Sequence, residues 1–393
     1  MIRKIAPLIV ALAISGLSLV ELFSIDPITG MRQLAWIGVG VMVFLLFYKA
    51  LSLDYLDRFS SWLFWLSVVL LLAVLVLGGP GVKRWFSLGF VKFQPSEFAK
   101  LALVLMLARL LSERPPGLAS FWKAMASAGL VFALIFVEPD LATAGSIAVL
   151  ISAILLVSGV DLGLLVMIYA PVFAAPASAS VWSFLGLAGL AFAFSRWRKK
   201  SWGYTLTLLT LITGVGLATP LVWNKALKPY QRKRIISFVS PASHKTAAGW
   251  QALQARIAIG SGGFWGKGFG KGTQKDLKFL PEAHTDFIFA AMAEEFGFVA
   301  SAAILLLFAL LLWSMVRAAV FLEDQFLRNI AVGAMVIIFY HAVFNLLSVL
   351  GLFPVAGIPL PFASYGGSHL LMEFALLGLV AAGVEEQERR MVY

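Results

Sequence analysis

The stretch SWLFWLSVVLLLAVLVLG, residues 61–78, carries no charged side chain. A helix of about 20 mostly apolar residues crosses the hydrocarbon core of a bilayer, so this stretch predicts a transmembrane helix. The same pattern recurs between Ile5 and Val384. Further apolar helices are predicted at 6–23, 34–51, 97–111, 121–137, 140–160, 162–178, 181–195, 203–223, 298–320, 327–350 and 369–385. The sequence thus predicts a polytopic membrane protein with about 10–12 transmembrane helices, in which 162–178 and 181–195 form either two spans or one broken hairpin.

Composition supports the same class. Of the 393 residues, 61% are hydrophobic and 13% are charged, against roughly 25% charged in an ordinary soluble domain. The mean hydropathy of +0.91 is too high for one soluble core, because a soluble fold keeps much polar surface. We predict an all-α fold in which residues 1–393 form a single membrane domain with one large extracytoplasmic loop, 224–297. Cysteine is absent, which excludes disulfides, thiolate metal sites and a cysteine nucleophile.

Basic residues orient the predicted helices. Lys and Arg total 31 against 20 Asp and Glu, a formal charge of +11. Many of these cations fall in alternate connections: Arg3, Lys4, Lys49, Arg58, Arg114, Arg196, Arg198, Lys199, Lys200, Arg317, Arg328, Arg389 and Arg390. By the positive-inside rule, those connections and both termini are predicted to be cytoplasmic. Function should then concentrate in the segments 79–100, 224–297 and 351–369, on the outer face.

A run of cations, KPYQRKR at residues 228–234, lies in the predicted outer loop. Such runs are commonly held by anionic headgroups, at about 1 kcal/mol per basic residue near the surface. That attraction belongs to the cytoplasmic leaflet, whereas this run is predicted outside. A specific anionic ligand is the better interpretation, and the planar fork of Arg232 or Arg234 suits a phosphate.

Residues 259–274 are rich in glycine and carry Lys267 and Lys271. They do not match the phosphate-binding spacing G-x-x-x-x-G-K-[ST], because Gly268 follows Lys267, and no predicted strand precedes them. Two interpretations stay open: a flexible linker, or a loop whose backbone and lysines bind an anion.

The string LPEAHTDFIFA, residues 280–290, carries a carboxylate at the mouth of an apolar helix. Asp286 opens that helical run, where the helix dipole alone would favour a negative charge. A carboxylate in an apolar mouth, after a loop full of cations, also suits a general base with a tuned pKa.

The string QPSEFAK, residues 94–100, predicts the start of a helix with Ser96 as the N-cap and Glu97 in the first turn. Lys100 opposes the helix dipole there. Glu97 and Lys100 share a helix face and can form an ion pair. Alternatively, Lys100 holds a substrate phosphate that Glu97 orients, and Lys83, Arg84 and Lys92 extend that positive surface.

Other polar residues carry less weight. Glu138-Pro139-Asp140 lies between two predicted spans and is a turn or a substrate contact. His341 and Asn345 are four residues apart in an apolar helix, which favours an interhelical hydrogen bond over a metal site. The chain has four His and no H-E-x-x-H motif, which argues against a zinc enzyme.

Together these strings resemble the SEDS family (shape, elongation, division and sporulation), and its rod-shape-determining RodA branch more than its division branch. The matching strings are RW (84–85), FQPSEFAK (93–100), PDL (139–141), YQRKR (230–234), IAIGSGG (257–263), GTQ (272–274), FLPE (279–282), HTDFIF (284–289), AEE (293–295), GLFPV (351–355), GIPLPF (357–362) and SYGGS (364–368).

The resemblance implies a peptidoglycan glycosyltransferase that polymerises lipid II into β-1,4-linked glycan strands at the outer face of the bacterial cytoplasmic membrane during cell elongation. It implies a class B penicillin-binding protein, which is a transpeptidase, and the elongation machinery as partners, and no nucleic acid. It places the essential carboxylate, as general base, at Asp286. It implies supporting substrate-binding roles for Glu97, Lys100, Gln231 and Lys92, the last matching only in charge because relatives carry Arg.

Negative charge develops on a lipid pyrophosphate leaving group in such a reaction, and cations would stabilise it. The candidates are Lys92, Lys100, Arg232, Arg234 and Lys267. No cofactor is certain and no metal ligand is identified; a divalent cation, Mg²⁺ or Mn²⁺, stays open.

The chain departs from the family in two places. The family usually has ten spans, and 162–178 with 181–195 resembles an added pair. His369 and Glu373 stand where small or apolar residues are expected. Two rival functions stay open: a transporter that flips lipid-linked cell-wall precursors, which also fits many spans and proline-broken helices, and a scaffold for a catalytic partner.

Overall fold

The computed structural model describes residues 2–78, 84–88, 91–138, 140–225, 232, 247–277, 279–280, 282–353, 355 and 357–392. Eight of its helical segments are long and apolar enough to cross a membrane. They are α1 (Ile2–Ile25), α2 (Pro27–Leu45) with the π-helical turn η1 (Leu46–Ala50), α3 (Leu53–Leu77), α5 (Leu118–Val137), α9 (Trp202–Lys225), α13 (Ile288–Phe321), α14 (Gln325–Val349) and α15 (Gly367–Val392). Four shorter helices are α4 (Pro95–Leu110), α6 (Leu141–Val157), α7 (Leu162–Ala177) and α8 (Val181–Trp197).

Every apolar segment predicted from the sequence is one of these helices, which confirms the polytopic helical fold class. The four shorter helices have 16 or 17 residues. At about 1.5 Å per residue they are shorter than a hydrocarbon core of about 30 Å. The side of the membrane on which the termini lie stays a prediction.

Local sequence explains several helix boundaries. Asp26 caps α2 by accepting a hydrogen bond from the Thr29 N–H at 2.9 Å, and Pro27 occupies the first turn. Asp324 caps α14 in the same way. Gly297 interrupts α13 with φ 71° and ψ −162°, a left-handed φ that glycine adopts without strain. The predicted span 298–320 begins directly after this kink.

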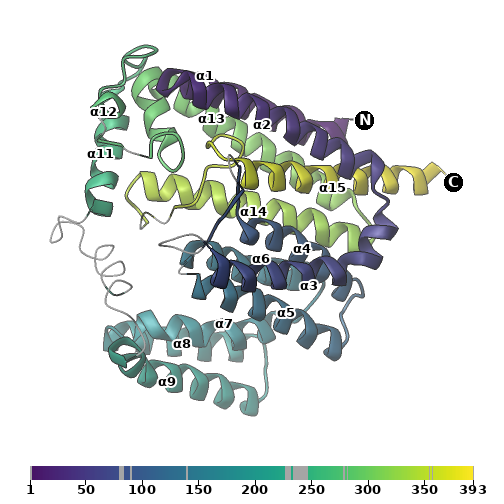
Figure 1. The fold of residues 1–393 in the computed structure, drawn as a ribbon. Coiled ribbons are helices and arrows are strands. Elements are labelled where there is room, and N and C mark those ends of the chain that lie inside the picture. Colours follow the sequence, from purple (N-terminus) through teal and green to yellow (C-terminus); the bar gives the residue numbers. More distant parts are fainter. Residues whose placement is uncertain are drawn as a thin grey trace. The chain divides into compact units, whose positions relative to one another are not determined.

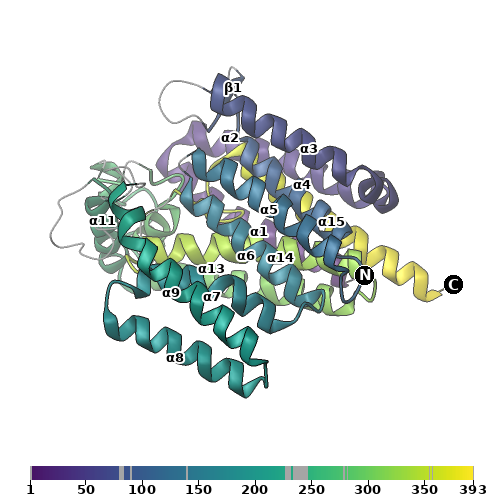
Figure 2. The same ribbon diagram turned by 90° about the horizontal axis from the view of Figure 1, so that it is seen from below.

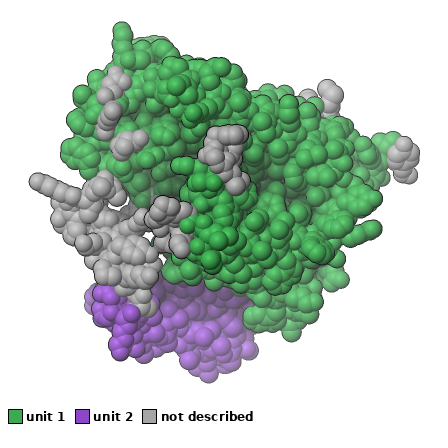
Figure 3. Space-filling model, in the orientation of Figure 1, with its two compact units in different colours: residues 1–158, 245–393 green, residues 159–244 purple. Residues whose placement is uncertain are grey.

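The chain divides into two compact units, residues 1–158 with 245–393, and residues 159–244 (Figure 3). In the first unit, α15 packs against α1, α2, α4 and α14 (Figures 1 and 2). Nearly all residues of α15 from His369 to Val384 are buried. The outer surface of the first unit is also apolar: Trp62 of α3 and Val320 of α13 are 76% and 77% exposed. An apolar exterior is what contact with lipid requires.

The second unit contains α7, α8 and α9, which pack pairwise against one another. Its core is built from Ala174, Ala191, Leu208 and Ile212. Lys200 at the α8–α9 connection forms an ion pair with Asp161, the N-cap residue of α7, at 2.6 Å. The predicted segments 162–178 and 181–195 are therefore two separate helices, both shorter than the eight helices that are long enough to cross a membrane. Whether they form two spans or one broken hairpin stays a prediction.

Short elements lie outside the long helices of the first unit. Strands β1 (Phe86–Leu88) and β2 (Val91–Phe93) pair antiparallel, with Ser87 opposite Lys92. Helices α11 (Ala247–Ser261) and α12 (Thr273–Asp276) precede α13 and lie near its start in Figure 1. The hairpin leads directly into α4, and the segment after α12 carries Asp286 into α13.

Candidate active site around Asp286

Asp286 lies in the turn that leads into α13. The helix begins at Ile288 with Phe287 as its N-cap, so Asp286 precedes the helical run by two residues instead of opening it. Its side chain is half-buried. Within the described ranges, its carboxylate has no hydrogen bond or ion pair. A carboxylate in this position is available to a ligand.

The environment of Asp286 is apolar and acidic. Burial, followed by the negative charges of Glu282 and Asp140, raises the pKa of Asp286 to about 6. Near neutral pH this carboxylate is mostly ionised but takes up a proton readily. That balance suits a general base, whose efficiency is highest when its pKa lies near the working pH.

A second acidic group stands at the start of α6, within electrostatic reach of Asp286. Asp140 caps α6 by accepting from the Thr143 N–H at 3.2 Å, and the Arg84 guanidinium lies 3.6 Å from its carboxylate. Arg84 also donates to the Glu138 carbonyl at 2.9 Å. Burial, followed by the charge of Asp140, raises the pKa of the Glu138 carboxyl to about 8. Asp140, paired with Arg84, is therefore a second carboxylate whose charge acts on Asp286.

Glu97 and Lys100 form a sealed ion pair at the start of α4. Lys100 Nζ lies 2.8 Å from Glu97 Oε1 and 2.9 Å from His341 Nε2 on α14, and all three side chains are buried. The predicted ion pair and the interhelical contact of His341 are confirmed. In this structure the Lys100 ammonium contacts Glu97 and His341. A phosphate-binding role for Lys100 stays a prediction.

The predicted N-cap of α4 was wrong. The helix begins at Pro95, the N-cap is Gln94, and the buried Ser96 hydroxyl has no partner in the described structure. Proline is favoured at the first helical position, where its missing N–H is not needed and its φ is already helical. This shifts Ser96 into the first turn, where its hydroxyl no longer caps.

The glycine-rich stretch is a packed loop on α13. A Cβ at Gly262 would lie 1.9 Å from the Ala293 carbonyl oxygen, and one at Gly266 would lie 2.1 Å from that of Glu295. The backbone N–H groups of Lys267 and Gly268 donate to α13 carbonyls at 3.0 and 2.9 Å. Only glycine permits so close an approach between two backbones.

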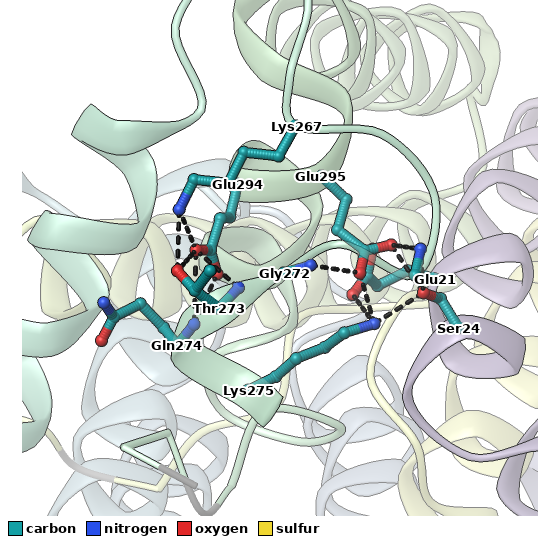
Figure 4. Close-up of polar contacts among 10 residues, drawn as sticks. Glu21, Ser24, Lys267, Gly272, Thr273, Gln274, Lys275, Glu294 and Glu295 are labelled. Carbon is teal, nitrogen blue, oxygen red and sulfur yellow. Dashed lines mark hydrogen bonds and ion pairs between the residues drawn. The ribbon is translucent and has the colours of Figure 1, made fainter. Parts of the chain in front are cut away.

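The glycine-rich loop binds two carboxylates of the chain itself, those of Glu294 and Glu295 on α13 (Figure 4). Glu294 accepts from Lys267 Nζ and from the backbone N–H groups of Thr273 and Gln274. Glu295 forms an ion pair with Lys275, and accepts from the N–H groups of Gly270 and Gly272 at 3.1 Å and from Ser24 at 2.6 Å. Lys267 is thus paired, and its predicted contact with substrate stays a prediction.

The other predicted substrate ligands belong to different elements or lie outside the described residues. Lys92 is exposed on β2, and its carbonyl accepts from Ser368 at 2.9 Å. Arg232, in the second unit, donates to the Asn224 carbonyl at 2.7 Å. Gln231 and Arg234 lie outside the described residues. The structure brings Glu97 to Lys100, but none of the cations in its described part forms an ion pair with Asp286.

The described residues do not form a metal site. Among them, no group of three or more His, Asp or Glu side chains is arranged to hold a metal ion. Asp286, Asp140 and Glu282 interact electrostatically, but the structure gives them no shared ligand geometry. A role for a divalent cation, Mg²⁺ or Mn²⁺, stays a prediction.

Comparison with known proteins identifies the family of the chain. A family model described as "Cell cycle protein", covering FtsW, RodA and SpoVE, matches residues 1–202 and 200–389. The chain belongs to this family. It is 33% identical to the peptidoglycan glycosyltransferase MrdB of Escherichia coli K12, over 89% of this chain and 84% of that one. It is 31% identical to the peptidoglycan glycosyltransferase RodA of Treponema pallidum, over 89% and 88%.

Solved structures of FtsW/RodA/SpoVE relatives share the fold. A chain of a peptidoglycan synthase complex that coordinates polymerization and crosslinking matches with a TM-score of 0.73 and 28% identity, over 97% of both chains. The rod shape determining protein RodA of Thermus thermophilus matches with a TM-score of 0.64 and 27% identity, over 98% of this chain and 97% of that one.

Sequence reasoning missed part of this family member's polar interior. The sequence assigns Glu294 and Glu295 no role of their own, yet both are fully buried and bind the glycine-rich loop. Adjacent carboxylates in an apolar helix need partners, and the glycine-rich loop was the nearest supply of N–H donors. His369 and Glu373, which had no assigned role, contact the segment 362–364.

Proposed function

We propose that this protein is a peptidoglycan glycosyltransferase that polymerises lipid II at the outer face of the bacterial cytoplasmic membrane during cell elongation. Family membership and the names of its relatives support the activity. The observation that carries the proposal for the site is the half-buried Asp286 carboxylate, unpaired within the described ranges, with its pKa raised to about 6.

In the proposed mechanism, Asp286 takes the proton from the GlcNAc 4-hydroxyl of one substrate. That oxygen attacks the anomeric carbon of the other substrate, and the bond to the lipid pyrophosphate breaks. An α-linked donor gives a β-1,4 product by inversion, so one displacement with a base is sufficient. Stabilisation of the leaving pyrophosphate falls to cations. Lys92, which is exposed, is the candidate in the first unit, and Arg232 and Arg234 stay candidates on the basis of sequence.

The rival functions predict different products. A transporter of lipid-linked precursors would move lipid II without forming glycan, and flipping needs two compartments. A scaffold would need its catalytic partner. Glycan made from lipid II by the isolated protein in detergent excludes both. The many apolar helices and bacterial relatives indicate a multi-pass protein of the inner membrane.

A crosslinking partner fits the proposed activity. The matching synthase complex combines polymerization with crosslinking. We propose a class B penicillin-binding protein as the partner here, acting with the elongation machinery, so that new glycan is crosslinked as it emerges.

The test is polymerisation of purified lipid II by wild type, Asp286→Asn and, as a control, Glu113→Gln. Glu113 is exposed in the connection after α4. Loss of a general base lowers the rate by roughly 100- to 10,000-fold, so Asp286→Asn should make almost no glycan while keeping the wild-type melting temperature. The control should polymerise normally. Normal rates for folded Asp286→Asn would remove Asp286 from the mechanism, and a chelator arm tests Mg²⁺ or Mn²⁺.

A further inference from the structure

We infer that Asp286 is held in position by a backbone clamp, in which Asn345 of α14 and Ser364 of the loop before α15 are positioning residues. The clamp consists of the donors that bind three consecutive carbonyl groups at residues 284, 285 and 286. This inference deepens the proposed function, because it concerns how the proposed base is aimed.

The contacts of the clamp are regular along the turn. The Tyr365 N–H donates to the His284 carbonyl at 2.9 Å, and the Ser364 hydroxyl donates to the Thr285 carbonyl at 2.7 Å. Asn345 Nδ2 donates to the Asp286 carbonyl at 2.8 Å. Because every peptide from 284 to 286 is fixed, the Cα of Asp286 cannot shift without breaking a hydrogen bond.

Asn345 is suited to this role by its two N–H donors. It is buried, and its Nδ2 also donates to the Ile358 carbonyl at 2.8 Å. With both acceptors being carbonyl oxygens, the side-chain orientation is determined, since only the amide nitrogen can donate. One side chain therefore joins the turn of Asp286 to the segment 357–360. In that segment, a Cβ at Gly357 would lie 3.7 Å from Asp286 Oδ2, so the segment that Asn345 holds lies beside the carboxylate.

The loop that supplies the clamp is itself fixed from the interior of the first unit. Phe362 has a left-handed φ of 58°, which is strained for a bulky residue and persists only when its surroundings hold it. Its N–H donates to Glu373 Oε2 of α15 at 2.9 Å, and its carbonyl accepts from Ser15 of α1 at 2.8 Å. The Ser364 carbonyl accepts from Gln33 of α2 at 3.1 Å.

This arrangement explains Glu373, a buried carboxylate in the apolar part of α15 between Leu370 and Val384. An acidic residue buried in a membrane helix needs a donor, and the Phe362 N–H is that donor. Glu373 acts on Asp286 only through the loop, and it touches neither the proposed base nor its carbonyl. Buried polar contacts of this kind fix one geometry, whereas apolar packing alone would tolerate several.

The clamp predicts a loss of rate without a loss of binding. In the test, Asn345→Leu removes both donors at similar size, and Ser364→Ala removes one. Ser348→Ala is the matched control, because its hydroxyl donates only to the Asn345 backbone carbonyl one turn earlier in the same helix. Misplacement of a catalytic group by about 1 Å can lower the rate roughly 100-fold.

We expect Asn345→Leu and Ser364→Ala to lower kcat for lipid II by roughly 10- to 100-fold, with KM within about twofold, and Ser364→Thr to restore kcat by restoring the hydroxyl. Ser348→Ala should match wild type. Unchanged kcat in folded Asn345→Leu and Ser364→Ala would overturn the clamp. If Asn345→Leu does not fold, the comparison of kcat between Ser364→Ala and Ser364→Thr tests the clamp.

A second readout is independent of catalysis. The chain has no cysteine, so Asp286→Cys introduces a single thiol whose reaction rate with a maleimide reports its exposure. Adding Asn345→Leu should raise that rate severalfold, and adding Ser348→Ala should not. An unchanged rate contradicts the clamp even if wild type makes no glycan, whereas an inactive wild type with a raised rate contradicts only the proposed function.

Discussion

At the scale of single residues, the chemistry depends on how burial changes a carboxylate. Asp286 has its pKa raised to about 6, from an ordinary value of 3.8, because burial and two neighbouring carboxylates disfavour its charge. A base must be deprotonated to act. The acid limb of activity should therefore belong to this one side chain.

We predict that kcat/KM for lipid II falls about tenfold per pH unit below a midpoint near 6. Above that pH Asp286 is ionised, and its titration no longer changes kcat/KM. Glu282→Gln removes one of the negative charges that raise this pKa, so its midpoint should move to lower pH. The measurement is initial polymerisation rate between pH 5 and 8, with melting temperatures at each pH; a flat profile for stable protein would contradict the assignment.

At the scale of elements, α13 is joined to the glycine-rich loop by two buried carboxylates. Glu295 is fully buried, and Lys275, its ion-pair partner, is 5% exposed at the side chain (Figure 4). Removing one member of a buried pair leaves an uncompensated charge, which is strongly destabilising. Exposed pairs contribute far less because water screens them.

We predict that Glu295→Ala lowers the free energy of unfolding by about 3–5 kcal/mol. Glu386→Ala, which removes an exposed pair with Arg390 on α15, should lower it by less than about 1 kcal/mol. Chemical unfolding in detergent measures both. Equal effects of the two substitutions would show that the loop is not anchored through Glu295.

At the scale of the whole molecule, the orientation in the membrane remains a prediction from the positions of Lys and Arg. The absence of native cysteine makes it directly testable. Leu277 and Val392 are 60% and 80% exposed, and they lie in the predicted outer loop and at the predicted cytoplasmic end.

We predict that an impermeant maleimide labels Leu277→Cys on intact spheroplasts, and that it labels Val392→Cys only after permeabilisation. The unsubstituted chain serves as the blank. The reverse pattern would place Asp286 on the cytoplasmic side and exclude polymerisation outside the membrane.

Sequence predicted the helices well because apolar length alone determines which segments can cross a bilayer. It also predicted the Glu97–Lys100 pair, since that pair depends on spacing within one helix. The role of Asp286 stays a prediction. Sequence did not predict that the glycine-rich loop binds Glu294 and Glu295, or that Asn345 binds a carbonyl 59 positions away in sequence. Such contacts depend on how distant elements pack, which neither periodicity nor residue spacing encodes.

The sealed contact of Lys100 with Glu97 and His341 has a consequence for biogenesis. Charged residues in a helix oppose insertion by the translocon, by up to about 2.5–3.5 kcal/mol each at the helix centre, and α4 carries Glu97 and Lys100 in its first two turns and is only 16 residues long. His341 belongs to α14 and is synthesised 241 residues after Lys100. We therefore expect α4 to remain at the bilayer surface or beside the translocon during synthesis, and to settle into the hydrocarbon only when α14 arrives.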